Sequence, residues 1–186
     1  DELDYLPRFR RKEFLNLKFN FDSKFEKICF KNTDKNIISL NRILVNNKQV
    51  FEISDPLIEN FNFKKCPFFF ILSFDKYEHM ICLVIDQNKK QIILYDSLID
   101  NESNFSKIVM KQAIPIIFKN NFKDYKFLKN KYGSKLEEEC VPNSIMFAYL
   151  NLKYNTDVNK FSEYMNSLTI EDKITLNLKF LKFLNF

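Results

Sequence analysis

Three apolar runs that follow one another in the middle of the chain constrain its fold more than any other feature. They cover residues 67–74, 80–85 and 91–95, and each is apolar almost throughout rather than at alternate positions. Runs this short are typical of strands, and continuous apolarity indicates strands that are covered on both faces. The polar segment 86–90 separates the last two runs, so we expect these strands to form an antiparallel pair.

The segments around these runs predict further strands and several helices. Apolar residues at helical spacing predict a helix over 37–44, which the turn pair Asn46 and Asn47 would end, and residues 49–53 indicate a short strand. Further along, we predict a helix that runs to about residue 120 with a kink at Pro115, and then a strand over 124–128. A helix should begin near Cys140, with one apolar face made by Ile145, Ala148, Tyr149 and Leu152. Two more helices are predicted over 157–168 and 170–184. We therefore expect an α+β fold with a central mixed or antiparallel sheet of about four to five strands flanked by helices.

The size and composition of the chain fit one domain. Of its 186 residues, 46% are apolar, which supplies a substantial core. We expect residues 36–186 to form this domain, and residues 1–35, which mix charge and Phe without periodicity, to be an N-terminal extension or accessory element of a longer protein. The net charge of +5 is spread along the chain, which argues against nucleic-acid binding. No apolar stretch approaches the roughly 20 residues of a membrane span, and we expect a monomeric domain.

The cysteines and the single histidine limit metal chemistry. Cys29, Cys66, Cys82 and Cys140 are irregularly spaced, and a zinc site would need nearly all of them beside His79. We therefore expect no metal and no cofactor. Scattered thiols suit a reducing, cytosolic compartment. The abundance of Phe, Lys, Asn and Ile, with one Gly and no Trp, is typical of an AT-rich coding sequence, as in an intracellular bacterium or a parasite.

Three residues in this framework have the chemistry of a thiol acyl-transfer site. His79 precedes the second apolar run, Asp96 follows the third, and Cys140 heads a predicted helix. In an antiparallel pair the start of one strand lies beside the end of the next, so Asp96 can bond one imidazole nitrogen and leave the other facing a nucleophile. At a helix start, Cys140 would gain from unpaired amides and the helix dipole, which stabilise a thiolate and a developing oxyanion.

Each of these residues alone has an ordinary structural explanation. A histidine at a strand start is most often a surface or core residue, a cysteine before an apolar helix is most often packing, and an aspartate before Ser-Leu is often a turn former. Their order, spacing and secondary context agree with one another, which favours the catalytic interpretation of His79, Asp96 and Cys140.

The same residues resemble a known family. In segment 79–98, His79 opens a strand, a Lys-rich turn follows, and Tyr-Asp-Ser-Leu closes the next strand. This order is similar to the catalytic segment of the ubiquitin-like-protein proteases, clan CE cysteine peptidases that include SUMO proteases and bacterial deubiquitinase effectors. Glu139 and Cys140 before an apolar helix resemble the family's Asp-Cys-Gly. The resemblance covers residues 67–152 and implies a papain-like or adenain-like cysteine protease architecture with His79, Asp96 and Cys140 as a catalytic triad.

Three positions depart from the family's pattern, and one of them is Val141, which stands where the family has glycine. The family usually has Trp after the histidine, where it covers the slot for a Gly-Gly tail, and this chain has Met80. The family also places a Gln shortly before the nucleophile to complete the oxyanion hole, and no Gln lies between Gln112 and the C-terminus. Ser134 or Asn130 could substitute for it, or the backbone alone could serve. The resemblance assigns Met80 and Glu139 to substrate binding, with Glu139 near the basic tail of ubiquitin or simply a solvated loop charge.

The reaction that the resemblance implies is cleavage of the peptide or isopeptide bond after the Gly-Gly terminus of ubiquitin or a ubiquitin-like protein, with deubiquitination favoured. The composition suggests the catalytic domain of an effector that is secreted into the host-cell cytoplasm. Three alternatives stay open: a YopJ-like acetyltransferase on the same scaffold, a catalytically dead module that binds ubiquitin, and an interaction domain in which the triad is coincidental.

Overall fold

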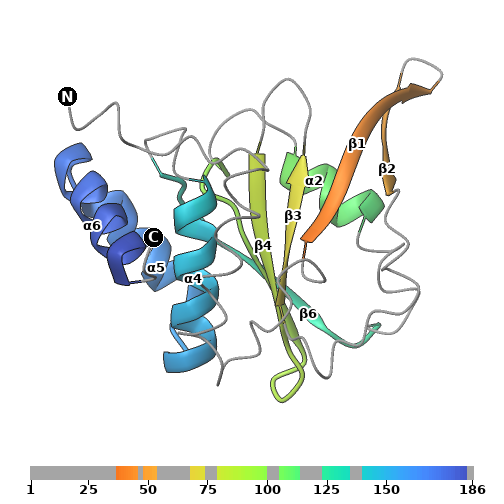
Figure 1. Ribbon diagram of the computed structural model, residues 1–186. Helices are drawn as coiled ribbons and strands as arrows, with labels where there is room; N and C mark the ends of the chain where they lie inside the picture. Colours follow the sequence, from red (N-terminus) through yellow and green to blue (C-terminus); the bar gives the residue numbers. More distant parts are fainter. Residues whose placement is uncertain are drawn as a thin grey trace.

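A single mixed sheet organises the chain. The computed structural model describes residues 37–45, 48–53, 68–73, 79–99, 105–113, 123–134 and 140–183. Within them, six strands form one sheet in the order β2-β1-β3-β4-β5-β6 (Figure 1). The strands are β1 (Ile37–Val45), β2 (Lys48–Ile53), β3 (Phe68–Ser73), β4 (His79–Asp86), β5 (Gln91–Tyr95) and β6 (Lys126–Lys129). The expected α+β class with a mixed sheet is confirmed, and the sheet is slightly larger than we expected.

The centre of the sheet is the antiparallel hairpin of β4 and β5, as the apolar runs predicted. Cys82 pairs with Tyr95 and Asp86 with Gln91, and residues 87–90 form the turn. Strand β3 pairs antiparallel with β4, and β6 pairs parallel with β5. On the outer side, β1 lies parallel to β3 and antiparallel to β2. The hairpin therefore has a neighbouring strand on each side, so neither of its strands is a sheet edge.

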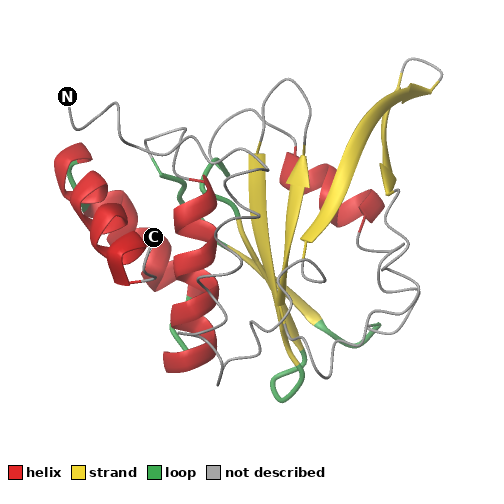
Figure 2. Cartoon of the chain, in the orientation of Figure 1, coloured by secondary structure: helices red, strands yellow, loops and turns green. Residues whose placement is uncertain are grey.

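Three helices form a layer on one face of the sheet. Helix α4 (Cys140–Tyr154) lies against β4, and α5 (Val158–Ser167) and α6 (Ile170–Phe183) contact α4 (Figure 2). Asp157 caps α5 by accepting hydrogen bonds from two backbone amides, and Thr169 Oγ1 caps α6 by accepting one from Asp172. The two helices predicted for the C-terminal segment are confirmed. Behind the sheet in Figure 1, the short helix α2 (Phe105–Ile108) continues as a π-helical turn, η5 (Val109–Ala113).

The main core lies between the sheet and α4, because alternate residues of the central strands face this helix. Tyr95 of β5 stacks on Phe147 of α4 with 5.3 Å between ring centroids, and it meets Phe161 of α5 edge-on at 5.1 Å. These rings join the end of β5 to the helix that Cys140 begins. The sheet contributes Phe68, Phe70, Met80, Cys82, Val84, Ile93 and Tyr95 to this cluster.

The central strands are buried on their other face as well. Ile81, Leu83 and Ile85, which alternate with the core residues of β4, are at most 2% exposed. Continuous apolarity therefore corresponds to a strand that is covered on both faces, as predicted.

Two local predictions differ from the structure. The helix expected over 37–44 is wrong, because this segment is β1, which pairs with β2 on one side and β3 on the other. Helix α4 was expected to have one apolar face, but residues 142–149 are all buried. A helix that lies between a sheet and two further helices has no solvent-facing side over that length.

Some predictions concern residues outside those that the structure describes. They are the turn at Asn46 and Asn47, the kink at Pro115, and the extension at residues 1–35. Of the helices within the described ranges, none has both the length and the apolarity needed to cross a membrane.

Candidate active site

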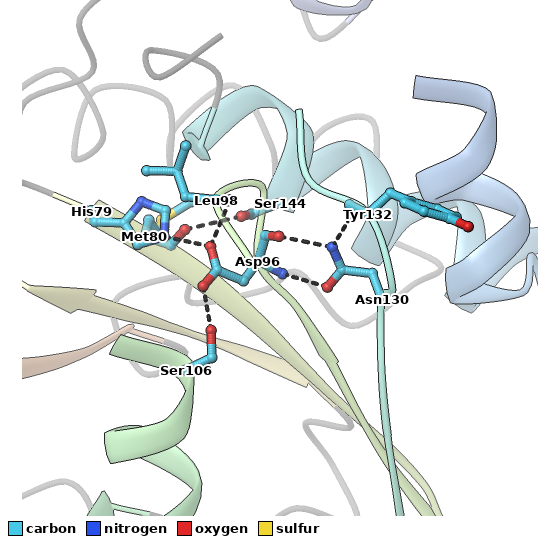
Figure 3. Close-up of polar contacts among 8 residues, drawn as sticks. All are labelled: His79, Met80, Asp96, Leu98, Ser106, Asn130, Tyr132 and Ser144. Carbon is cyan, nitrogen blue, oxygen red and sulfur yellow. Dashed lines mark hydrogen bonds and ion pairs between the residues drawn. The ribbon is translucent and has the colours of Figure 1, made fainter. Parts of the chain in front are cut away.

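His79 and Asp96 meet at one end of the β4–β5 hairpin. His79 is the first residue of β4, and Asp96 directly follows β5. His79 Nε2 donates a hydrogen bond to Asp96 Oδ1 at 2.6 Å (Figure 3). Continuing the hairpin register places Asp96 opposite Ile81, so Asp96 is a diagonal neighbour of His79 rather than its direct cross-strand partner. The structure thus brings together the two residues that the sequence pairs, with a small offset along the strands.

The Asp96 carboxylate is fully buried, and donors surround it. Oδ1 accepts a second hydrogen bond from the Leu98 backbone amide at 2.9 Å. Oδ2 accepts a hydrogen bond from Ser106 Oγ, which reaches it from α2 (Figure 3). Because every one of these donors favours the charged form, they offset the cost of burying an ionised carboxylate.

The backbone of Asp96 is held by Asn130, which follows β6. Asn130 Oδ1 accepts a hydrogen bond from the Asp96 amide at 3.0 Å, and Asn130 Nδ2 donates to the Asp96 carbonyl at 2.8 Å. The same Nδ2 donates to the Tyr132 carbonyl at 2.9 Å. This side chain therefore completes the backbone hydrogen bonding of Asp96 just beyond the last strand residue of β5 (Figure 3).

Cys140 approaches His79 from the helix layer. It is the first residue of α4 and is 9% exposed. Ser144, one turn further along α4, donates from Oγ to the Met80 carbonyl at 3.3 Å, which ties this end of the helix to the residue after His79. His79 interacts with the Cys140 side chain, and because its Nε2 is bonded to Asp96, the nitrogen that can serve Cys140 is Nδ1. The imidazole therefore lies between a carboxylate and a thiol.

The protonation states of His79 and Asp96 depend on each other. Burial by itself lowers the pKa of His79, but the hydrogen bonds and charges of Asp96 and Cys140 outweigh it and raise the pKa from 6.5 to about 10. Burial would raise the pKa of Asp96, yet its bonds to His79, Ser106 and Leu98 keep it below the ordinary 3.8. At neutral pH these shifts describe an imidazolium beside a carboxylate.

The two side chains expected to complete an oxyanion hole have other partners. Both protons of the Asn130 amide go to the Asp96 and Tyr132 carbonyls, so the oxyanion role of Asn130 stays a prediction that would require one of these bonds to break. The Ser134 amide donates to the Ser97 carbonyl at 2.6 Å, and Ser134 Oγ accepts a hydrogen bond from Lys173 Nζ at 3.4 Å.

The expected substrate-binding residues have different outcomes. Met80 is completely buried and belongs to the core cluster that faces α4, and its contact with substrate stays a prediction. Its position follows from the two-residue period of β4, which directs neighbouring His79 and Met80 to opposite faces of the sheet. Glu139 lies outside the residues that the structure describes. Among the described residues, no group of three or more His, Cys, Asp or Glu could hold a metal ion.

Sequence reasoning missed Ser106 and Ser144 entirely. Ser144 and the Met80 carbonyl that it bonds are 64 positions apart in the sequence. Ser106 is only 10 positions from Asp96, but its contact depends on how α2 packs against the sheet. The one available signal was a serine soon after the Asp-Ser-Leu turn, at the start of a predicted helix.

A buried imidazole between a carboxylate and a cysteine at a helix start defines a Cys-His-Asp site on an α+β fold. No protein-family model and no curated protein matches the sequence. Solved structures of similar fold include the SUMO protease Ulp1 with its catalytic cysteine oxidised to a sulfenic acid, at 13% identity and TM-score 0.46 over 68% of this chain and 56% of that chain.

Two further structures are similar at the same level. One is the C-terminal Ulp1 protease domain in complex with Smt3, the yeast ortholog of SUMO, at 12% identity and TM-score 0.43 over 97% of this chain and 99% of that chain. The other is an ASFV protease, at 14% identity and TM-score 0.43 over 86% of this chain and 64% of that chain. The chain spans only 56% of the length of the first structure, Ulp1 with the oxidised cysteine.

Proposed function

We propose that this chain is a cysteine peptidase or isopeptidase that cleaves after the Gly-Gly terminus of ubiquitin or a ubiquitin-like protein, with ubiquitin as the favoured modifier. The observation that carries the proposal is the buried His79 imidazole, which Asp96 holds on one nitrogen while Cys140 lies beside it. A histidine in this arrangement can exchange a proton with the thiol and later deliver one to a leaving group.

The chemistry follows from the three groups. The Cys140 sulfur attacks the carbonyl carbon of the modifier's last glycine, and the electrons of the carbonyl move to its oxygen. The backbone amides at the start of α4 lack partners within the helix and can donate to this oxyanion. His79 then donates its proton to the lysine amine as the carbon–nitrogen bond breaks. Water, which His79 deprotonates, attacks the thioester and releases the modifier with a free carboxylate.

Asp96 keeps the imidazole available for these steps. Its charge stabilises the imidazolium during each proton transfer, and its bond to Nε2 leaves Nδ1 directed at the thiol. Cys82 provides a useful contrast, because it is fully buried in β4 and burial raises the pKa of its thiol. Only a cysteine with a basic partner fits the nucleophile's role.

The test is covalent capture by ubiquitin, SUMO and related modifiers that carry an electrophile at the C-terminus. The wild-type domain should form an adduct of one modifier per chain with at least one probe. Cys140→Ala should form none, while the matched variant Cys82→Ala, which removes the other described free thiol, should still react. Wild-type protein that is folded but forms no adduct with any probe would refute the peptidase proposal.

A catalytically dead, ubiquitin-binding module is the second candidate, and one observation favours it. The Asn130 amide, which was expected to stabilise the oxyanion, is committed to backbone carbonyls. Losing one oxyanion donor typically costs on the order of 10² to 10³ in rate. Binding of ubiquitin by the wild-type domain without adduct formation would support this candidate over the peptidase.

The proposed setting is the reducing cytoplasm of a host cell, with the domain acting as part of a secreted effector. AT-rich composition and a chemistry directed at a eukaryotic modifier support this proposal. Finding the encoding gene in a free-living eukaryote would contradict it.

A further inference from the structure

We infer that Ser106 and Asn130 are positioning residues, which hold Asp96 so that its carboxylate aims the His79 imidazole at Cys140. The inference rests on the proposed thiol chemistry and adds a second set of residues to it. Neither residue touches His79 or Cys140 through any contact described above, so each acts through Asp96.

Asp96 needs such support because of its place in the fold. It directly follows the last residue of β5, so it has no described ladder pairing of its own. It is also offset from His79 along the strands, and the contact depends on the side chain reaching diagonally. A small rotation of its backbone would therefore move Oδ1 away from Nε2.

Asn130 prevents this rotation through the backbone. Its side-chain amide bonds both the N–H and the C=O of Asp96, at 3.0 and 2.8 Å, in the way that a neighbouring strand would. Asn130 is only 1% exposed, and its remaining proton goes to the Tyr132 carbonyl. The amide plane is thus fixed on both sides, and it fixes the peptide groups on either side of the Asp96 Cα.

Ser106 acts on the carboxylate itself. Its hydroxyl donates to Oδ2, while His79 and the Leu98 amide occupy Oδ1. This division sets the rotation of the carboxylate about its Cβ–Cγ bond, because each oxygen has its own fixed donor. Ser106 is 5% exposed and lies on α2, so a helix outside the β4–β5 hairpin supplies this hydrogen bond (Figure 3).

Among the described residues, the charged and titratable groups around the Asp96 carboxylate come from three elements. His79 belongs to β4, Asp96 follows β5, and Cys140 begins α4. Ser106 and Asn130 are neutral, so they change no net charge when they are replaced. Asn130 bonds only the backbone of Asp96, whereas Ser106 also stabilises the charged carboxylate, so Asn130→Ala is the variant that separates positioning from charge stabilisation.

The decisive experiment follows the His79 ring by NMR across pH, because the chain has one histidine and its signal needs no assignment. In Ser106→Ala and Asn130→Ala we expect the pKa of His79 to fall below its wild-type value, because the carboxylate is no longer held against Nε2. Ser106→Thr retains the hydroxyl and should restore the wild-type titration. Asn151→Ala is the matched control, since Asn151 also donates to a backbone carbonyl, at 2.9 Å, but at the far end of α4.

A second readout is the rate at which iodoacetamide alkylates Cys140, measured by peptide mass spectrometry against pH. This rate should fall in Ser106→Ala and stay unchanged in Asn151→Ala. If a modifier is cleaved, kcat should fall by about 10-fold to 100-fold in Ser106→Ala with little change in KM, which is the range for losing a hydrogen bond to a charged group.

The outcomes separate this inference from the proposed function, because neither the titration nor the alkylation needs a substrate. Wild-type titrations of His79 in both Ser106→Ala and Asn130→Ala would overturn the inference, even if the domain cleaves ubiquitin. Shifted titrations would support it, even if no modifier reacts. Should one alanine variant fail to fold, the other variant and Ser106→Thr decide the question.

Discussion

Replacing Asp96 with Asn tests the electrostatics of the site directly, because the variant keeps the shape of the side chain and removes its charge. In the wild-type protein the pKa of His79 is raised from 6.5 to about 10. At about 1.4 kcal/mol per tenfold change in proton affinity, that difference corresponds to about 5 kcal/mol in favour of the imidazolium. In Asp96→Asn the carboxylate no longer opposes the burial of His79, so we expect the pKa of His79 to fall well below its wild-type value.

The pKa shifts of His79 and Asp96 also determine how the stability of the folded protein changes with pH. The folded-state pKa of His79 lies above 6.5, so the contribution of His79 is complete below pH 6.5 and is lost as pH rises through about 10. The pKa of Asp96 is lowered, so its contribution is present above pH 3.8 and is lost as pH falls further. Both statements describe one ion pair, and breaking a buried pair typically costs about 3–5 kcal/mol. Compared with the wild-type protein, Asp96→Asn should therefore be less stable chiefly between pH 3.8 and about 10, and the difference should be small at more alkaline pH.

The assay is an NMR titration of the single histidine ring in wild type and Asp96→Asn, together with urea unfolding at neutral and alkaline pH. Turnover, if the proposed peptidase activity is found, should fall on the order of 10⁴ in the variant, as when the acid of a catalytic triad becomes an amide. A wild-type His79 that titrates at or below 6.5 would refute the reasoning. So would an identical titration in the variant.

Three further changes should affect the framework of the site. Gly133→Ala would place a Cβ 2.5 Å from the Ser97 carbonyl oxygen, so we expect the free energy of unfolding in urea to fall by about 1–3 kcal/mol. A variant as stable as the wild-type protein would show that Gly133 does not approach Ser97 this closely. Phe161→Ala removes a ring that packs edge-on against Tyr95 and should cost about 3–5 kcal/mol by the same measurement, whereas a change below 1 kcal/mol would contradict the packing described. Asp157→Ala removes the cap of α5 and should lower the free energy of unfolding by about 1 kcal/mol without altering the His79 titration.

The central hairpin could be predicted because its signals are local. Continuous apolar runs with a polar turn between them specify two strands and their antiparallel pairing, and the register then brings the start of β4 near the end of β5. The proximity of His79 and Asp96 follows from that pairing. The helix that Cys140 begins could be predicted for the same reason, since its apolar residues recur within one segment.

The failures concern segments whose structure depends on distant partners. The apolar residues of 37–44 suit a helix by spacing, yet the segment is a strand because β2 and β3 supply hydrogen bonds along both of its edges. The burial of Met80 against α4 is likewise a consequence of packing, which its position after the histidine does not reveal. Local propensity is a weak preference that tertiary contacts override.

The sequence by itself determined the chemistry that this protein can offer: one histidine, an aspartate at the end of the following strand, and a cysteine at a helix start, all positioned by short-range patterns. Only the tertiary structure decided how that chemistry is supported. Asn130 is 34 residues from Asp96 in the sequence, and Ser106 reaches the carboxylate from a helix outside the hairpin. Such contacts carry no periodic signal, because a hydrogen bond made by a side chain needs only that folding bring two compatible atoms together.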